Sequence, residues 1–344
     1  MDKNAIVRLG VDLNKGVKTF SFEDNTYSAS EATDVLRQAL VDANGGNSTF
    51  NYKALRRNKV EIFEIIEELI PQIVNEGLSG SEFWNDNVDY KNIALGDKNE
   101  FLVEDDTDFV VSTIADGIAT PRRQRAGAGT RVSVDTSVHA IRIYEEFSRF
   151  MSGRIDWNAL CNKVAEAFQK AIWQDIYAEF AAVTANLASP YGVSAATTGT
   201  PDADELLELI AHIEAATGKT AKIVGTQAAL KKMSDIAVAN GVSDKAKDDL
   251  YAQGFYGKFY GTEVFKLNQV HTAGTDNFAF ADDVIYVIAT DDKFIKFVNE
   301  GETIIDDRDW TENADMTIEY RMLQRWGVAL ALSSKGIGRY KFTA

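Results

Sequence analysis

The chain has 344 residues and a formal net charge of −16, which argues against a dedicated nucleic-acid binder, because such proteins neutralise phosphates with clustered Lys and Arg. A hydrophobic share of 45% at this length indicates a globular protein of one elaborate domain or two to three lobes. One cysteine excludes an internal disulfide framework, no apolar run approaches a membrane span, and the charged start differs from a secretion signal, so we expect a reducing, aqueous compartment.

The first fifty residues are polar and weakly periodic, and we interpret them as an arm. They hold one short amphipathic piece, residues 30–41, which Ser30 is expected to cap. A helix follows from about Lys59 to residue 78, with an apolar stripe on one face and glutamates on the other. Pro71 lies inside this pattern and is expected to kink the helix or end it.

Residues 88–144 change to short runs with strand-like alternation, which predict a long hairpin or extended loop. Its two limbs differ in charge: residues 81–120 hold ten acids and two lysines, whereas 120–131 adds four arginines and no acid. A solvated charge run would explain either limb alone, but the two together favour electrostatic pairing. The candidate contact residues of the cationic limb are Arg122, Arg123, Arg125 and Arg131.

A long helix is predicted within residues 153–183, because apolar side chains recur every three or four positions for about thirty residues. At ~1.5 Å per residue this helix is roughly 45 Å long, so we name it the spine helix. The candidate core residues of the spine helix are Trp157, Leu160, Val164, Phe168, Ile172, Ile176 and Phe180.

Helices and strands alternate in residues 201–290, which predicts a compact α/β lobe. Its first helix is expected to open with a capping box made by Asp202 and Glu205. The remaining chain, from residue 291 onward, returns to strands with one apolar face. Because a sheet needs a cover for such a face, we expect these strands to pack on the spine helix.

Residue types that could carry enzyme chemistry form no recognisable site. The sequence "GKT" at 218–220 lacks the earlier glycine of a phosphate loop, since Ile213 stands there, and the acidic run 306–312 lacks the glycine of a calcium loop. Cys161 has no evident histidine partner and is interpreted as a small core residue. The histidines are far apart and form no zinc-type i, i+4 pair: His139, His212 and His271. We predict no catalytic site, no cofactor and no metal, although the many acids leave paired carboxylates open.

The order of the expected elements and several short sequence segments together resemble a known family. The segments are "FEIIEELI", "VDYKNIALGDKNEF", "FSRFMSGRIDW", "KFIKFVNEGETIIDDRDW" and "RWGVALALSSKGIGRY". From about Lys59 to the C-terminus, the chain resembles the major capsid protein of tailed bacteriophages, which has the Hong Kong 97 fold. The resemblance implies an α+β capsid fold with these parts: an N-terminal arm and helices (1–87), an extended β loop (88–144), a peripheral domain with the spine helix (145–200 and 291–344) and an α/β axial domain (201–290).

The resemblance further implies a structural subunit that self-assembles into hexamers and pentamers of an icosahedral head enclosing double-stranded DNA. Implied partners are other copies of the chain, a portal protein, and scaffold or decoration proteins, with the packaged DNA enclosed but not bound specifically and no membrane involved. The location would be the virion capsid, assembled in the bacterial host cytoplasm, and we expect an uncleaved arm. Two alternatives stay open: an encapsulin-like compartment shell, and a cytosolic α/β enzyme with its site in 201–290.

Overall fold

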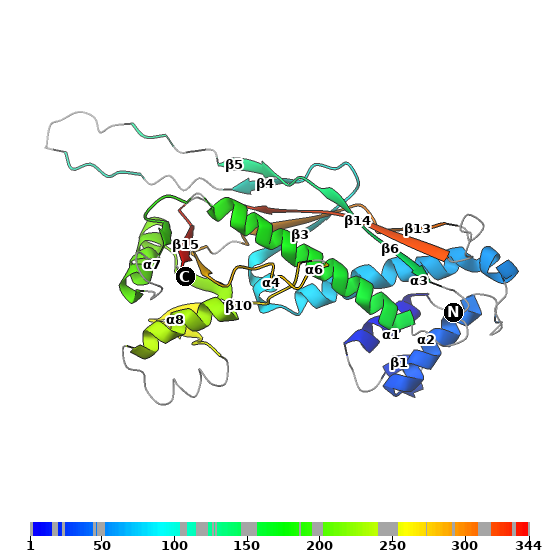
Figure 1. Cartoon of the computed structure of the whole chain (residues 1–344). Coiled ribbons are helices and arrows are strands. Elements are labelled where there is room, and N and C mark those ends of the chain that lie inside the picture. Colours follow the sequence, from blue (N-terminus) through cyan, green and yellow to red (C-terminus); the bar gives the residue numbers. More distant parts are fainter. Residues whose placement is uncertain are drawn as a thin grey trace.

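The computed structural model describes most of the chain, and its parts follow the order of the sequence (Figure 1). The described residues are 3–15, 20–22, 25–43, 46, 52–103, 109–114, 123–125, 127, 129–145, 157–185, 187–194, 202–239, 254–272, 274–290, 293–308, 318–331 and 335–342. Among them, no helix is both long and apolar enough to cross a membrane.

The N-terminal part is a packed group of helices. Its elements are α1 (Lys3–Asn14), β1 (Phe20–Phe22), β2 (Asn25–Tyr27), α2 (Ala29–Ala43), α3 (Tyr52–Ser79) and α4 (Glu82–Asn87). Helix α1 packs against α3 so closely that a Cβ on Gly10 would lie 2.8 Å from Leu69 Cδ1. Buried side chains of α1 and α2 join the same apolar cluster as the spine helix. The described residues among the first fifty therefore pack into the body of the protein, whereas the sequence led us to expect a polar arm.

Two local expectations for these helices are corrected. Helix α2 begins at Ala29, so Ser30 lies inside its first turn and does not precede the helix. The preceding residue is Ser28, whose backbone N–H and hydroxyl both donate to the Glu31 carboxylate, at 2.9 and 2.8 Å. Helix α3 does not end at Pro71, one of the two expected outcomes, but continues to Ser79. Buried apolar side chains on both sides of the proline hold the helix in place: Leu69, Ile70, Ile73 and Val74.

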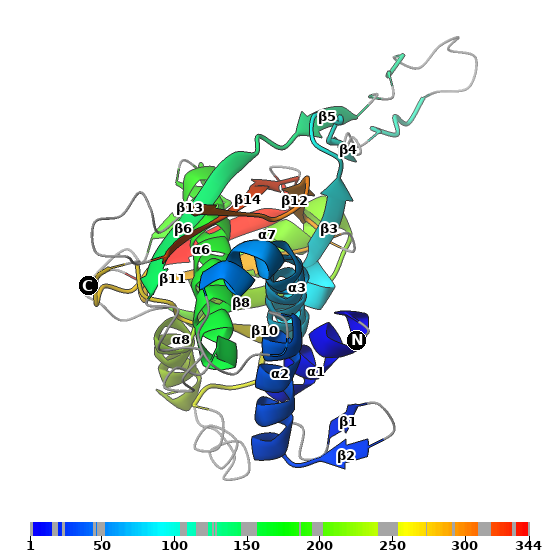
Figure 2. The same cartoon turned by 90° about the vertical axis from the view of Figure 1, so that its right-hand side faces the viewer.

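A five-stranded sheet covers one side of the α3 and spine-helix pair, and the α1–α2 pair lies on another side (Figure 2). Its strands are β3 (Val88–Ile93), β6 (Ser137–Glu145), β12 (Ile295–Glu300), β13 (Ile304–Arg308) and β14 (Ile318–Leu330). The order is β13-β14-β12-β3, and β6 also pairs with β14. Strands β3 and β12 are parallel, and the other pairs are antiparallel.

The spine helix is α6 (Trp157–Thr184), and the returning strands pack on it as predicted. Phe168 is 4% exposed and meets the fully buried ring of Trp326 on β14 edge to face, with ring centroids 5.7 Å apart. The Trp326 indole N–H donates to the carboxylate of Asp175 at 2.8 Å. Of the candidate core residues, Leu160 is half-buried, the side chain of Trp157 lies outside the described set, and the others are buried: Val164, Phe168, Ile172, Ile176 and Phe180.

The α/β lobe is built on a six-stranded sheet in the order β7-β15-β11-β8-β10-β9. Its elements are β7 (Gly192–Ser194), α7 (Ala203–Thr217), β8 (Lys222–Thr226), α8 (Gln227–Ala239), β9 (Lys258–Phe259), β10 (Thr262–Leu267), β11 (Val284–Ile288) and β15 (Ile337–Lys341). Helices α7 and α8 cover one face of the sheet. On the other face, the Phe180 ring of the spine helix meets the Tyr286 ring at 5.2 Å. Strand β11 is buried throughout because both faces are covered.

The lobe differs from the sequence expectation in two ways. Strands β7 and β15 come from the segments that were assigned to the peripheral domain, yet they pair into this sheet. In addition, Asp202 caps α7 as predicted, but Glu205 does not complete the capping box. The Tyr340 hydroxyl accepts from the Asp202 backbone N–H at 3.2 Å and donates to the Glu205 carboxylate at 3.0 Å. Strand β15 thus connects the two residues that the pattern had paired directly.

Candidate assembly surface

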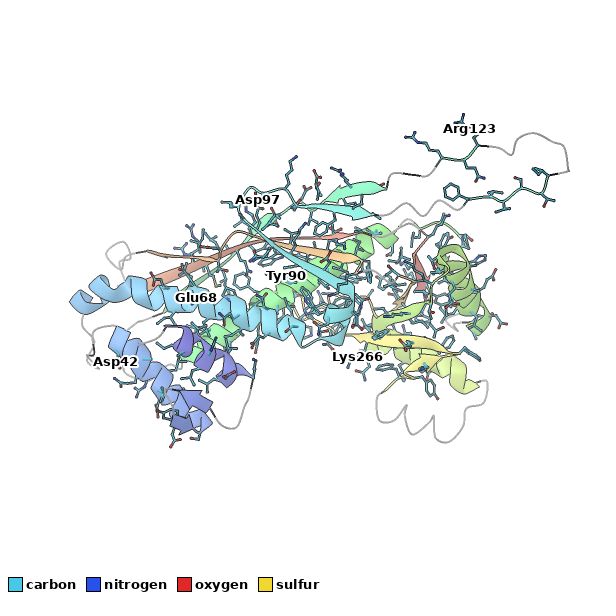
Figure 3. The ribbon with its side chains drawn as sticks, turned by 180° about the vertical axis from the view of Figure 1, so that it is seen from behind. Asp42, Glu68, Tyr90, Asp97, Arg123 and Lys266 are labelled. Carbon is cyan, nitrogen blue, oxygen red and sulfur yellow. The ribbon has the colours of Figure 1, made fainter. Side chains whose placement is uncertain are left out.

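The extended loop leaves the five-stranded sheet after Ile93 and returns to it at Ser137. Near the sheet, its limbs form an antiparallel pair of strands, β4 (Glu100–Val103) and β5 (Thr130–Ser133). Farther out, residues 109–114 and 123–125 run away from the body on the side of α7 (Figures 1 and 3). A side chain in this position cannot be buried by its own subunit.

The outgoing limb of the loop exposes apolar side chains. Val111 is 96% exposed, and its apolar neighbours are exposed as well: Phe109, Val110 and Ile114. Isolated apolar residues on a surface are ordinary, but a contiguous apolar strip marks an interaction surface in most soluble proteins. The loop therefore carries an apolar strip, residues 109–114, that is suited to contact another surface.

The returning limb presents the cationic side chains. The Gln124 side-chain amide donates to the Val110 carbonyl and accepts from the Val110 N–H, both at 2.7 Å, so the two limbs are joined at this point. Successive side chains of an extended chain point to opposite sides. Arg123 and Arg125 flank Gln124, and both side chains are exposed. Figure 3 shows Arg123 on the part of the loop that is held away from the body.

The four candidate arginines have different positions. Arg123 and Arg125 lie together on the exposed limb, whereas Arg122 lies outside the described residues. Arg131 is in β5, and its guanidinium contacts the Glu100 carboxylate of β4 at 3.2 Å. The opposite charges of the limbs thus pair within one chain at Arg131, which has a carboxylate partner without a second subunit.

One cluster in the described residues contains the side chains of a hydrolase, but with a different geometry. The Ser137 hydroxyl and the Asp175 carboxylate approach the same ring nitrogen of His139, Nε2, at 2.8 and 3.8 Å. A catalytic relay needs the serine and the aspartate at opposite nitrogens. Burial lowers the pKa of His139, although Asp175 acts in the other direction, and the ring stacks on Trp326 with centroids 3.6 Å apart. The imidazole joins β6 to β14 as a packing element.

The described residues also hold no group of three or more His, Cys, Asp or Glu side chains placed to bind a metal ion. Cys161 is buried on the spine helix, consistent with its interpretation as a core residue. The features that stand out for function are therefore the apolar strip and the exposed arginines of the extended loop.

Comparisons with known proteins identify the family. Residues 5–340 match the family model described as "SPbeta prophage-derived putative capsid protein YonB". This match includes the N-terminal helices, whereas the sequence resemblance was placed from about Lys59 onward. No curated protein matches the chain.

Solved capsid structures share the fold. The chain has a TM-score of 0.51 and 11% identity with a subunit of the bacteriophage PhiM1 mature capsid, covering 76% of this chain and 87% of that one. With the capsid subunit of a native GTA particle, the TM-score is 0.53 and the identity 14%, over 76% of this chain and 89% of the other. The α+β phage capsid fold expected from the sequence is therefore confirmed. The chain belongs to the family of the SPbeta prophage-derived capsid protein YonB and is a structural, non-enzymatic protein of the phage capsid.

Proposed function

We propose that this chain is the major capsid protein of a tailed-bacteriophage head, whose copies assemble as hexamers and pentamers into an icosahedral shell around double-stranded DNA. The observation that carries the proposal is the extended loop, with its apolar strip and exposed arginines held away from the body. Ordering such a loop costs conformational entropy that its own contacts do not offset. A neighbouring subunit that covers the loop would supply the missing burial.

In this assembly, the spine helix and the five-stranded sheet would form the peripheral domain, which takes most of residues 145–200 and 291–344 together with β3 and β6. The lobe 201–290, joined by β7 and β15, would form the axial domain facing the symmetry axes of hexamers and pentamers. Assembly would take place in the bacterial host cytoplasm, with a portal protein and scaffold or decoration proteins as further partners. The packaged DNA would be enclosed without specific binding.

The loop would dock on a neighbour through two kinds of contact. The apolar strip would be buried, and Arg122, Arg123 and Arg125 would reach carboxylates on the adjacent subunit. A planar guanidinium suits this role because it binds a carboxylate through two hydrogen bonds. Each exposed ion pair contributes only about 0 to 1 kcal/mol, but a closed shell repeats the contact in every subunit.

The test replaces Arg122, Arg123 and Arg125 by Glu and images the purified protein by negative-stain electron microscopy. We expect the unassembled variant to keep its thermal transition while shell formation is lost or strongly slowed. The matched control replaces the same residues by Lys, which keeps the charge and should assemble better than the Glu variant. A second variant, Val110→Ser with Val111→Ser, tests the apolar strip in the same assay.

Salt gives an independent measurement of the charged contact. Raising the ionic strength should slow wild-type assembly, because exposed charges are screened over about 8 Å at physiological salt and over less at higher salt. In the Glu variant, added salt should not slow assembly, because it screens the repulsion that the introduced acids create. Normal shells from the triple Glu variant would mean that the arginines are an ordinary solvated strip.

A further inference from the structure

A single carboxylate contacts both ends of the extended loop where they meet the sheet. Glu300 is the last residue of β12, and its side chain is only 10% exposed. One carboxylate oxygen accepts from the backbone N–H of Gly96, in the turn that leads into the outgoing limb, at 2.9 Å. The other oxygen accepts from the Thr136 hydroxyl, at the end of the returning limb.

The groups around Glu300 favour the ionised form of its carboxyl group. The hydrogen bond from Thr136, followed by that from Gly96, lowers the pKa of the carboxyl group, so it is ionised at neutral pH. The Arg325 guanidinium of β14 lies 3.9 Å away and acts in the same direction. Three segments that are distant in the sequence, at residues 96, 136 and 300, thus meet at one ionised group.

Neighbouring contacts keep the two ends of the loop close to each other and to the sheet. The Asn99 side-chain amide donates to the Val134 carbonyl at 2.5 Å and accepts from the Val134 N–H at 3.3 Å. Phe101 and Val134 are buried against Val298 of β12. These contacts join the two limbs beside β4 and β5 and seat the pair on the sheet, while the Glu300 carboxylate contacts both the turn at Gly96 and the end at Thr136.

We propose that Glu300 is a positioning residue whose carboxylate sets the direction in which the extended loop leaves the sheet, and that this direction selects the neighbour surface the loop reaches. The second part rests on the proposed function, because it assumes that the loop docks on another subunit. Leverage makes the direction important. Residues 109–114 lie far from the sheet (Figure 1), so a small tilt of β4 and β5 at the sheet moves these residues by a much larger distance than it moves the base of the loop.

The test measures the loop direction in the unassembled, full-length subunit. In a Cys161→Ala background, Thr130→Cys on β5 and Lys170→Cys on the spine helix carry spin labels at exposed positions, and double electron–electron resonance gives the distance distribution. In Glu300→Ala we expect a shifted distribution that is about twofold broader, since the turn and the returning end are released. The matched control is Glu302→Ala, an exposed carboxylate two residues away, which should leave the distribution unchanged.

Two further variants separate positioning from general stability. Thr136→Val replaces the hydroxyl by a methyl group and should shift and broaden the distribution as Glu300→Ala does. Combining the two should add little, because both remove the contact between Thr136 and Glu300. Glu300→Gln keeps an oxygen for Gly96 and an amide for the Thr136 hydroxyl, so it should restore most of the parent distribution. If Glu300→Ala fails to fold, the same measurement on Thr136→Val decides whether the Glu300 contact positions the loop.

The outcomes distinguish this inference from the proposed function. Parent-like distributions in both Glu300→Ala and Thr136→Val would overturn the positioning role, whatever happens to assembly. A broadened distribution together with lost shells supports both parts of the proposal. A broadened distribution with normal shells supports the positioning of the loop and overturns its role in selecting the neighbour surface.

Discussion

Trp326 is the residue at which the packing of the subunit converges. Its indole is fully buried on β14, donates to Asp175 of the spine helix, stacks on His139 of β6 and meets the ring of Phe168. Aromatic pairs of this kind add to the stabilisation from burial, and the buried N–H has its partner. Three elements are thus fixed relative to one another around one side chain.

Phe168 tests this packing directly. Phe168→Ala removes a buried ring and leaves a cavity, so we expect the free energy of unfolding to fall by about 3–5 kcal/mol. Phe168→Asp also buries an unpaired charge and should give insoluble protein. The measurement is chemical denaturation of Phe168→Ala together with the soluble fraction of Phe168→Asp.

The control for Phe168 is Lys170→Asp, which introduces the same acidic side chain at an exposed position of the same helix. It should change stability by no more than about 0.5 kcal/mol. Soluble, normally assembled Phe168→Asp protein would contradict burial of this face of the helix.

Among the elements, β14 runs directly beneath the returning limb of the extended loop. A Cβ on Gly327 would lie 2.3 Å from the Asp135 carbonyl oxygen and 2.9 Å from the Val134 side chain. The first of these atoms is backbone and cannot rotate away. The glycine therefore allows strand and loop to approach as closely as they do.

Gly327→Ala should force the strand and the returning limb apart. We expect a loss of about 1–3 kcal/mol in the free energy of unfolding, as for other overpacked sites, and a shift of the same label distances that report on the loop. The comparison variant is Gly80→Ala, whose Cβ would meet only ordinary contacts at 3.5 Å and beyond. Equal stability of the two alanine variants would show that the close approach at Gly327 is not required.

The elements differ in how far the sequence predicts them. The spine helix is long and strongly periodic, so both its extent and its buried face follow from the pattern. Helix α1 was missed because Val7, Leu9 and Val11 alternate as in a strand, and tertiary packing decides its conformation. The pairing of β15 with β11 was not predicted, because alternation indicates which face of a strand is buried but not its partner strand.

The candidate assembly surface, too, is only partly predictable from the sequence. The cationic limb is visible in the sequence because four arginines stand among small residues without an acid. The pairing of Arg131 with Glu100 depends on the register of β4 and β5, which charge counts do not contain. Glu300 carries no signal at all, since its role arises only when residues 96, 136 and 300 meet in space.

Over the whole molecule, the net charge of −16 opposes binding to DNA, because a surface of this charge repels phosphates. In the proposed shell, this repulsion would suit a wall along which packaged DNA slides. Unassembled subunits should therefore retain no duplex DNA in a gel-shift assay at submicromolar protein and physiological salt.

The arginine-to-Glu triple variant is the control for this prediction. A shift of any DNA sequence by wild-type protein would contradict the prediction. If the variant abolished that shift, the cationic limb would be identified as the DNA contact.

One apolar cluster extends from α1 through α3 and the spine helix to strands of both sheets, including Ile6, Phe180 and Ile337. Load on any of these elements is consequently shared with the others through close-packed side chains of low compressibility. In the proposed shell, the body would respond to internal pressure as a stiff plate, whereas residues 109–114 and 123–125 of the loop are exposed and would yield more easily. Wall strength and adaptation to curvature would then belong to different segments of one chain.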